Sequence, residues 1–415
     1  MKEYFRLFPY CELVGGCKNS ALYNKITGQI ISLTDDKLKM LYLADNNMKL
    51  ENIEGCDYEF FNRLVDMELG MYFHKPLYIE KFKFGFEGEM KKLLKVNTEI
   101  KSAQIEITTE CNLDCKFCKK DDNTLYRKTG CKRWKVNDKK LSIQDWDNII
   151  NQLISIGCQE ITFIGGEPLL KFNILKHIVE YSRNRGIKNF TIYTNGALLD
   201  YENIRFIKEN NIKLIIQLPT IDKDMYKNLT GNGELDILLK NLEELKENRI
   251  DFSILYLIHR YNDCEVNVNT VLSQYSDNIV REYIYPKPNN AFFSDKVFKD
   301  IYSYRNKLLQ PNEYIYSYLK ENNCCYGQKI GITCDGEVLP CIMSRTLNLG
   351  NILEKKLYEI LDEEYYKIRN LSKDNITKCK DCSFKYGCFE CRALEISATG
   401  IIDGVEYCEL VKERI

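Results

Sequence analysis

The feature that most constrains the fold is a regular alternation of short apolar runs and helical patterns across the middle of the chain. Six runs read as strands, at residues 103–108, 160–164, 190–194, 213–218, 252–257 and 281–285. Helical patterns lie between most of them, and one should begin after the N-cap Ser142 and end at Gly157. Strand–helix–strand repeats with apolar strands predict a parallel sheet that is buried on both faces. The expected fold class is α/β, a partial (β/α)6, TIM-like barrel, with ligands at the carboxyl ends of its strands.

Three cysteines follow the first of these strands directly. Cys111, Cys115 and Cys118 have the spacing C-x3-C-x2-C. Three thiolates that converge on one point suit an iron–sulfur cluster, and a cubane with three protein ligands leaves one iron open for a substrate. Zinc is the competing interpretation, but structural zinc usually takes four ligands, and no fourth Cys or His lies close by in the sequence. Three buried structural thiols would not need this spacing.

Two further motifs stand at the ends of the next two strands. Gly165-Gly166-Glu167-Pro168 follows the second strand, where glycines allow close approach of the backbone and the carboxylate can pair with a cation. Thr194-Asn195-Gly196 follows the third strand, although a plain strand-to-helix turn explains these residues nearly as well.

The cysteine spacing and the Gly-Gly-Glu-Pro turn together resemble the signature of the radical S-adenosylmethionine (SAM) superfamily, in which an aromatic residue precedes the last cysteine, as Phe117 does here. The resemblance implies a [4Fe–4S] cluster on Cys111, Cys115 and Cys118, with SAM on the open iron. One-electron reduction, from a donor such as flavodoxin or ferredoxin, would split SAM to methionine and a 5′-deoxyadenosyl radical that abstracts a substrate hydrogen.

The resemblance also implies which residues contact SAM. They lie at the strand ends: Gly165, Gly166, Glu167, Pro168, Thr194, Asn195 and Gln217. Relatives often carry a serine in the fourth strand and an Arg-Gly pair after it. Gln217 and Thr230-Gly231 stand there in this chain, so the partner of the SAM carboxylate is open.

Cysteines gather again toward the carboxyl end. Two pairs have x2 spacing, and further cysteines lie on either side of them: Cys325, Cys341, Cys379, Cys382, Cys388, Cys391 and Cys408. This number exceeds the need of one zinc ribbon and predicts two clusters, or one cluster and one zinc. Asp335-Gly336 predicts a hairpin turn between strands at 329–334 and 337–341.

The order of these cysteines is similar to that of the SPASM domain, which follows the barrel in peptide-modifying radical SAM enzymes, although two residues rather than three precede Cys391. The resemblance implies one auxiliary [4Fe–4S] cluster with four ligands: Cys379, Cys382, Cys388 and Cys408. It implies a second one with three: Cys325, Cys341 and Cys391. The fourth ligand of the second could be Cys324 or Cys334, or its iron could be open and bind a substrate thiolate.

Residues 1–95 read as a separate unit. The pattern predicts strands at 20–24 and 29–33, helices at 35–44 and 59–69 with Gly70 as a C-cap, and a strand at 71–73. A hairpin with helices is a winged-helix-like plan, and it resembles the leader-peptide recognition module of many peptide-modifying radical SAM enzymes. Such a module would bind the leader as an added strand. A packing domain that buttresses the barrel is an equally good interpretation.

Three domains are therefore expected: the recognition-like unit at 1–95, the barrel at 96–290, and a linker with the SPASM domain at 291–415. The net charge of −1 argues against a general nucleic-acid binder. No run is apolar for long enough to span a bilayer. The 18 cysteines without an opening signal peptide indicate reduced thiols in a cytoplasmic protein.

One polar, basic stretch, residues 119–140, reads as a loop insertion near the site. Cys131 within it is a candidate catalytic thiol, although a solvated surface loop is at least as good an interpretation. The isolated His74, His177 and His259 are expected to be structural or surface groups.

The sequence predicts a radical SAM peptide maturase, which abstracts a hydrogen from a ribosomally made precursor peptide and installs a thioether or carbon–carbon crosslink. A formylglycine-generating, sulfatase-type maturase is the alternative in the same class. A small-molecule radical enzyme is a weaker one. A non-enzymatic iron–sulfur electron carrier would need neither the open three-cysteine site nor the Gly-Gly-Glu-Pro turn.

Overall fold

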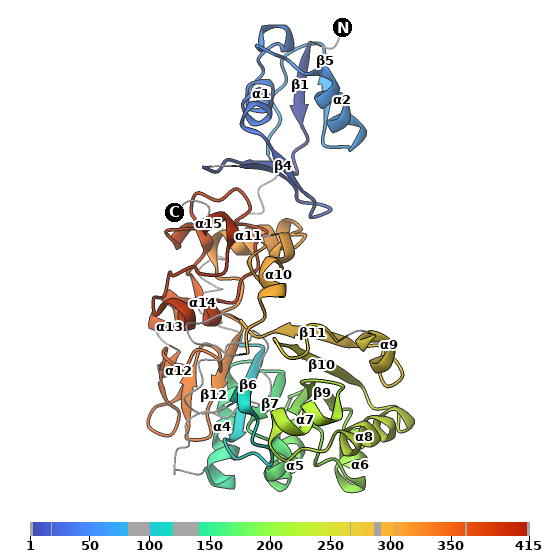
Figure 1. Cartoon of the computed structure of the whole chain (residues 1–415). Coiled ribbons are helices and arrows are strands. Elements are labelled where there is room, and N and C mark those ends of the chain that lie inside the picture. Colours follow the sequence, from blue (N-terminus) through green and yellow to red (C-terminus); the bar gives the residue numbers. More distant parts are fainter. Residues whose placement is uncertain are drawn as a thin grey trace.

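The computed structural model describes residues 3–17, 19–81, 100–118, 141–265, 267–285, 292–303, 305–361 and 363–412. The N-terminal unit lies at one end of the molecule, the β/α barrel at the other, and the C-terminal part between them (Figure 1). No helix in the described ranges is long and apolar enough to cross a membrane.

A nine-stranded sheet forms the centre of the chain, in the order β11-β10-β9-β8-β7-β6-β12-β13-β14. Its parallel strands are β6 (Ser102–Thr108), β7 (Glu160–Gly165), β8 (Asn189–Thr194), β9 (Lys213–Leu218), β10 (Phe252–Ile258) and β11 (Ile279–Tyr283). Each pairs in parallel with its neighbour in this order. All the strands that the sequence predicted for the barrel are confirmed, with the last shifted toward the N-terminus.

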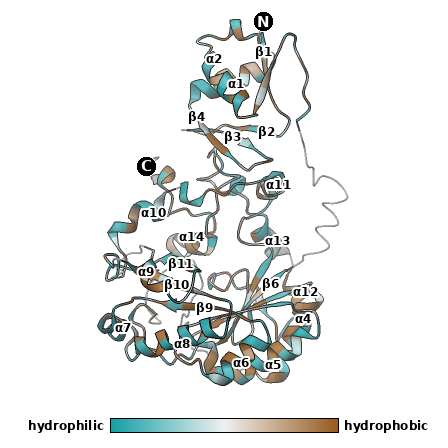
Figure 2. Ribbon diagram, turned by 90° about the vertical axis from the view of Figure 1, so that its right-hand side faces the viewer, coloured by the Kyte–Doolittle hydropathy of each residue, from teal (hydrophilic) through white to brown (hydrophobic). Residues whose placement is uncertain are grey.

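Helices follow these strands, and all but the last of them lie along one face of the sheet (Figure 2). They are α4 (Ile143–Ser155), α5 (Phe172–Arg183), α6 (Tyr201–Glu209), α7 (Lys223–Thr230), α8 (Leu235–Glu247) and α9 (Val268–Leu272). The predicted start of α4 is confirmed: Ser142 Oγ accepts from Asp145 N at 3.2 Å, and Asp145 Oδ2 accepts from Ser142 N at 2.8 Å.

Apolar side chains from both layers form one core between the sheet and the helices. Ile105, Phe163, Ile192 and Ile216 from the strands are fully buried against helix residues such as Ile149. Each such side chain contributes about 1.5–3 kcal/mol by its burial. This core fixes the strand ends, on which the predicted site residues stand.

The C-terminal part continues the same sheet. β12 (Lys329–Ile332) pairs in parallel with β6, and β13 (Glu337–Leu339) and β14 (Gly350–Asn351) add antiparallel strands. The predicted turn is confirmed, with Gly336 at φ +87°. The helices of this part are α10 (Phe298–Tyr302), α11 (Glu313–Glu321), α12 (Leu357–Ile360), α13 (Glu363–Arg369), α14 (Arg392–Thr399) and α15 (Glu409–Lys412).

The N-terminal unit has a core of its own. β1 (Tyr4–Leu7) pairs with β5 (Gly70–Phe73), while β2 (Cys11–Val14), β3 (Ser20–Asn24) and β4 (Ile30–Leu33) form an antiparallel sheet. α1 (Asp35–Asp45) and α2 (Tyr58–Asp66) pack on them. The predicted hairpin and both helices are confirmed. The C-cap at Gly70 is wrong: this residue begins β5, where a Cβ would lie 2.5 Å from Arg6 O, so pairing with β1 requires the glycine.

The β2–β3–β4 sheet rests on the C-terminal part. The Tyr23 hydroxyl donates to Ser383 O at 2.8 Å, and Cys17 N donates to Asp381 O at 3.0 Å. Tyr23 shares a buried cluster with Tyr316 and Tyr386. The unit therefore covers the loop that carries the late cysteine pairs.

Candidate functional site

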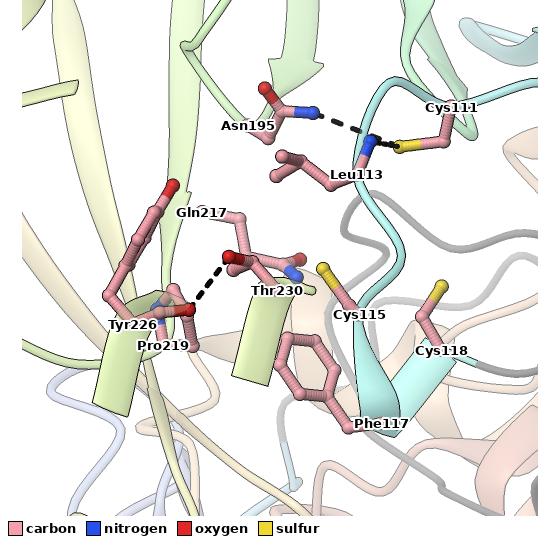
Figure 3. Close-up of a pocket in the computed structure, with 10 residues that line it drawn as sticks. All are labelled: Cys111, Leu113, Cys115, Phe117, Cys118, Asn195, Gln217, Pro219, Tyr226 and Thr230. Atoms are coloured by element: carbon pink, nitrogen blue, oxygen red, sulfur yellow. Dashed lines mark hydrogen bonds between the residues drawn. The ribbon is translucent and has the colours of Figure 1, made fainter. Parts of the chain in front are cut away.

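A pocket at the carboxyl ends of the barrel strands brings the three early cysteines together (Figure 3). Its lining residues are Cys111, Leu113, Cys115, Phe117, Cys118, Asn195, Gln217, Pro219, Tyr226 and Thr230. Figure 3 shows the sulfur atoms on one side of the pocket and the amides of Asn195 and Gln217 on the other. Three thiols and two amides of the predicted set thus face one space.

The cysteine loop is held in place by the end of α7. Asp114 N donates to Thr230 O at 2.9 Å, and Asn232 Nδ2 donates to Asn112 O at 3.1 Å. Gly231, at φ +80°, turns the chain at this contact. The segment where relatives carry an Arg-Gly pair therefore supports the cysteine loop here.

Two donors point at the first thiol. Leu113 N lies 3.5 Å and Asn195 Nδ2 3.8 Å from Cys111 Sγ. Asn195 Nδ2 also donates to Asn112 Oδ1 at 2.9 Å. Donors near sulfur favour the thiolate, the form that binds metal.

The two glycines of the Gly-Gly-Glu-Pro turn let its backbone pack closely against the backbone before Cys111. A Cβ on Gly165 would lie 2.1 Å from Thr108 O, and one on Gly166 would lie 2.1 Å from Glu110 O. Gly166 N donates to Thr108 O at 2.9 Å. The close approach that the sequence predicted is thus made to the chain's own backbone, which brings β7 against the loop before Cys111.

Glu167 lies behind the pocket rather than in its lining. Its fully buried carboxylate accepts from Thr194 Oγ1 at 2.8 Å, Asn195 N at 2.8 Å and Leu169 N at 3.0 Å. Burial raises the pKa of Glu167 to about 7, against the effect of these donors. The carboxylate ties the ends of β7 and β8 together, and Pro168 starts the short 3-10 helix that follows.

Phe117 closes the floor of the pocket. Its ring centroid lies 6.4 Å from that of His259 and 6.2 Å from that of Phe292. His259 Nε2 donates to Pro219 O at 2.8 Å, and burial lowers the pKa of this imidazole to about 4. A neutral, buried His259 agrees with its predicted structural role.

The late cysteines form two sets. Burial lowers the pKa of Lys329, but the Cys341, Cys325 and Cys391 thiolates outweigh it and hold that pKa above its ordinary value. Cys341 is buried in one core with Cys325 and Cys391 against it. The three cysteines of the predicted three-ligand set therefore all lie near Lys329.

The other set, of four cysteines, lies beneath the N-terminal unit. Cys382 and Cys408 pack on one cluster of apolar residues, and Cys379 and Cys408 on another. Burial raises the pKa of Cys388 to about 11, and its neighbours include Cys408 and Lys373. The cysteines of the predicted four-ligand set thus share apolar clusters and charged neighbours.

The two candidate fourth ligands of the Cys325 set have other neighbours. Cys324 Sγ donates to Glu390 O at 3.4 Å. Cys334 shares a hydrogen bond with the buried Glu106 carboxylate, which also pairs with Arg345. Cys131 lies outside the described residues.

Sequence reasoning missed Tyr226 in the pocket and Lys329 beside the late cysteines. A lysine in the otherwise apolar run of β12, near Cys325, was a usable signal for Lys329. Tyr226 had no such signal, because its place in the pocket depends on how α7 packs.

Comparison with known proteins identifies the family. Residues 105–268 match the family model of the radical SAM superfamily, and residues 324–383 match that of the SPASM iron–sulfur cluster-binding domain. The chain carries a radical SAM domain followed by a SPASM domain. This confirms the family predicted from the cysteine spacing and the Gly-Gly-Glu-Pro turn.

Curated relatives match parts of this radical SAM and SPASM chain. A GTP 3',8-cyclase of Clostridium perfringens is 29% identical over 175 residues, which are 41% of this chain. The chain spans about half the length of that relative, 51%. The radical SAM cyclopropyl synthase TigE of Paramaledivibacter caminithermalis is 23% identical over 309 residues, 71% of this chain and 64% of that one.

Solved structures share the fold. Native anSMEcpe with bound AdoMet has a TM-score of 0.57 at 18% identity, over 75% of this chain and 94% of that chain. Streptococcus suis SuiB bound to precursor peptide SuiA has a TM-score of 0.54 at 20% identity, over 96% of both chains. The second match extends into the N-terminal unit, and the predicted α/β fold class is confirmed.

The two domains imply SAM and several [4Fe–4S] clusters, and the residues fit them. Three thiols line one pocket beside two amides, and the late cysteines form two partly buried sets. Among the described residues, no group of three or more His, Cys, Asp or Glu side chains is arranged around a single point as the ligands of one metal ion would be.

Proposed function

We propose that this radical SAM enzyme modifies a ribosomally made precursor peptide and installs a thioether or carbon–carbon crosslink in it. The observation that carries the proposal is the fold similarity to SuiB bound to precursor peptide SuiA, which covers 96% of both chains. A match of that extent takes in the N-terminal unit, the barrel and the SPASM domain together. Each of the three has a task in peptide modification.

In the barrel, Cys111, Cys115 and Cys118 hold the cluster that, when loaded, supplies the 5′-deoxyadenosyl radical from SAM. Asn195 and Gln217 lie across the pocket from the thiols and offer amide groups to the polar ends of SAM. The buried side chains of Leu113, Phe117 and Tyr226 line the pocket and keep water from it.

The SPASM domain holds two auxiliary clusters in this proposal. Cys379, Cys382, Cys388 and Cys408 supply four ligands to one of them. Cys325, Cys341 and Cys391 supply three to the other, while the Cys324 thiol donates to Glu390 O and Cys334 shares a hydrogen bond with Glu106. An iron without a protein ligand can bind a thiolate of the peptide, which suits a thioether product.

The N-terminal unit offers a place for a leader. β2 and β4 are the outer strands of their sheet, and each pairs only with β3 among the described residues. An extended leader can add to such an edge through backbone hydrogen bonds. The contact of the same sheet with the C-terminal part also supports the buttress interpretation, and the two tasks are compatible.

The first test is reductive SAM cleavage. The chain is purified without oxygen and reconstituted with iron and sulfide, and dithionite and SAM are added. We expect 5′-deoxyadenosine from the parent, and a loss of at least about 100-fold in the Cys111→Ala/Cys115→Ala/Cys118→Ala variant, since the cleaving cluster loses its ligands. The Cys158→Ala variant, which removes a buried thiol at the other end of β7, is the control. If the triple variant makes 5′-deoxyadenosine at the parental rate, the three cysteines do not hold the cluster that cleaves SAM.

The second test identifies the substrate class by mass. A precursor peptide that loses two hydrogens and gains a link between residues supports the proposal, and reduced flavodoxin or ferredoxin can replace dithionite as the electron donor. A peptide aldehyde would favour the formylglycine-type alternative. The likeness to GTP 3',8-cyclase favours a second candidate, a small-molecule radical enzyme, so GTP is tested beside the peptide. Modification of GTP and of no peptide would overturn the proposal.

A further inference from the structure

A network of charged side chains is buried inside the SPASM domain. Lys373 Nζ lies 3.2 Å from Glu390 Oε1, and Arg392 Nη2 lies 2.9 Å from Glu390 Oε2. The exposed fractions of these side chains lie between 0 and 7%. Removing each ion from water costs several kcal/mol, roughly, so a buried network of this kind needs strong compensation.

The compensation within the described protein is incomplete at Arg392. Its Nη2 donates to Glu390 Oε2 and, at 2.6 Å, to Gly404 O. Its Nε and Nη1 are buried and have no hydrogen-bond partner in the described part of the chain. A guanidinium is always protonated, and each unmatched buried donor costs about 1–3 kcal/mol. An acceptor from outside the polypeptide would remove that cost.

The network lies between the two late cysteine sets. Glu390 stands between Cys388 of one set and Cys391 of the other, and Arg392 follows Cys391 in the sequence. Arg392 Nη2 donates to Gly404 O, and the next residue, Val405, lies in a buried cluster against which Cys379 and Cys408 pack. The orphan donors are therefore near the four-cysteine set.

We propose that Arg392 is a positioning residue for the auxiliary cluster of Cys379, Cys382, Cys388 and Cys408: its Nε and Nη1 donate hydrogen bonds to sulfur atoms of that cluster. This rests on the ligand assignment made under the proposed function, and on no particular peptide. Sulfur atoms of the cluster would accept the hydrogen bonds for which Arg392 Nε and Nη1 have no acceptor in the described part of the chain. Hydrogen bonds to sulfur and nearby charge set the reduction potential of such clusters, so Arg392 and Lys373 raise it and Glu390 lowers it.

The test reads the potential of the cluster, not turnover. The full chain carries Cys111→Ala, Cys115→Ala and Cys118→Ala, so that only the auxiliary clusters are present, and redox titration is followed by electron paramagnetic resonance. Arg392→Met should make reduction at least about tenfold less favourable, a shift of about 59 mV to lower potential. Glu390→Gln should move the potential upward, because it removes the anion and retains the shape.

Two further variants separate the hydrogen bonds from the charge and from structure. Arg392→Lys retains the positive charge but loses the planar fork, so the potential should fall by less than in Arg392→Met. Arg6→Met is the matched control, because Arg6 is also buried and paired, with Asp45 in the N-terminal unit. The reduction potential of the cluster in the Arg6→Met variant should equal that in the parent. Pulsed resonance on protein labelled with guanidino-15N arginine should show 15N coupling to the reduced cluster, and Arg392→Lys should lose it.

Iron and sulfide are counted first, which separates two kinds of failure. If the parent loads no cluster on the four-cysteine set, the ligand assignment falls and the inference falls with it. If the cluster loads and the potentials of the Arg392→Met and Glu390→Gln variants equal the parental value, only the inference is overturned. Where Arg392→Met fails to fold, the opposite shifts in Arg392→Lys and Glu390→Gln still decide the matter, because a purely structural role gives no such pair of signs.

Discussion

Glu167 joins the ends of two neighbouring strands behind the pocket. Its buried carboxylate accepts hydrogen bonds from Thr194 Oγ1 and Asn195 N, at the end of β8. Burial raises the pKa of Glu167 to about 7. A carboxyl pKa that is raised in the folded state makes the free energy of unfolding depend on pH.

Glu167 should therefore make stability depend on pH. Its folded-state pKa of about 7 lies above that of an unfolded glutamate, about 4.3. Its contribution is complete below the unfolded pKa and is lost as pH rises through about 7. Between about pH 5 and about pH 7.5 the free energy of unfolding should fall by the order of 1–3 kcal/mol through this group, and Glu167→Gln should remove that part of the slope.

Urea unfolding followed by circular dichroism at both pH values measures the effect. Glu160→Gln is the control, since Glu160 lies exposed at the other end of β7. Equal slopes for the parent and Glu167→Gln would show that the carboxyl does not titrate in this range.

Other residues of the site had no signal that sequence reasoning could use. The spacing of Cys111, Cys115 and Cys118 is local, so it could be read directly, and the pocket confirms that they lie together. The network of Lys373, Glu390 and Arg392 depends on a pairing between separate loops. In a chain with 29% charged residues, each of these looks like an ordinary surface residue.

At the scale of elements, the local pattern predicted well and the long-range pairing did not. The barrel strands and α4 with its Ser142 cap follow from periodicity and capping, which act within a few residues. The junction of β12 with β6 joins segments far apart in the sequence, so no local pattern could reveal it. The junction makes the SPASM hairpin part of the barrel sheet.

The hairpin should therefore stabilise the barrel. Ile332 on β12 is fully buried in the barrel core and pairs in register with Ile105 of β6. Ile332→Ala should lower the free energy of unfolding by about 2–5 kcal/mol, because it opens a cavity in that core. Ile401→Ala, at a residue that is 57% exposed in the same domain, should change it by less than about 0.5 kcal/mol.

Denaturant unfolding gives the stability, and iron bound at the Cys111 set in each variant gives the effect on the site. We expect Ile332→Ala to lower the amount of iron bound at the Cys111 set at 37 °C, because the weakened barrel opens more often at that temperature. A variant that loses only auxiliary clusters would mean that the hairpin folds independently of the barrel.

At the scale of the whole molecule, the N-terminal unit lies against the set of four late cysteines, Cys379, Cys382, Cys388 and Cys408. Ile30 of β4 packs on Gly387, where an added Cβ would lie 2.3 Å from the Ile30 side chain. Tyr23 is 1% exposed, and its ring lies 5.1 Å from that of Tyr316 and 6.5 Å from that of Tyr386. The sheet that we propose as the binding edge for a leader is thus the sheet that packs near Cys382 and Cys408.

This arrangement predicts that the N-terminal unit protects the auxiliary cluster beneath it. Tyr23→Ala removes a buried ring and its hydrogen bond to Ser383 O, which together are worth about 3–5 kcal/mol of packing, so water should reach the cluster more readily. Iron should then pass to an external chelator several-fold faster, while the Cys111 cluster loses iron at the parental rate. Tyr42→Ala, at a tyrosine of α1 that is 60% exposed, is the control and should change neither rate. Equal chelation rates in Tyr23→Ala and the parent would mean that the unit only rests on the domain. A faster rate would mean that anything bound to the sheet, a leader included, can alter access to the cluster below it.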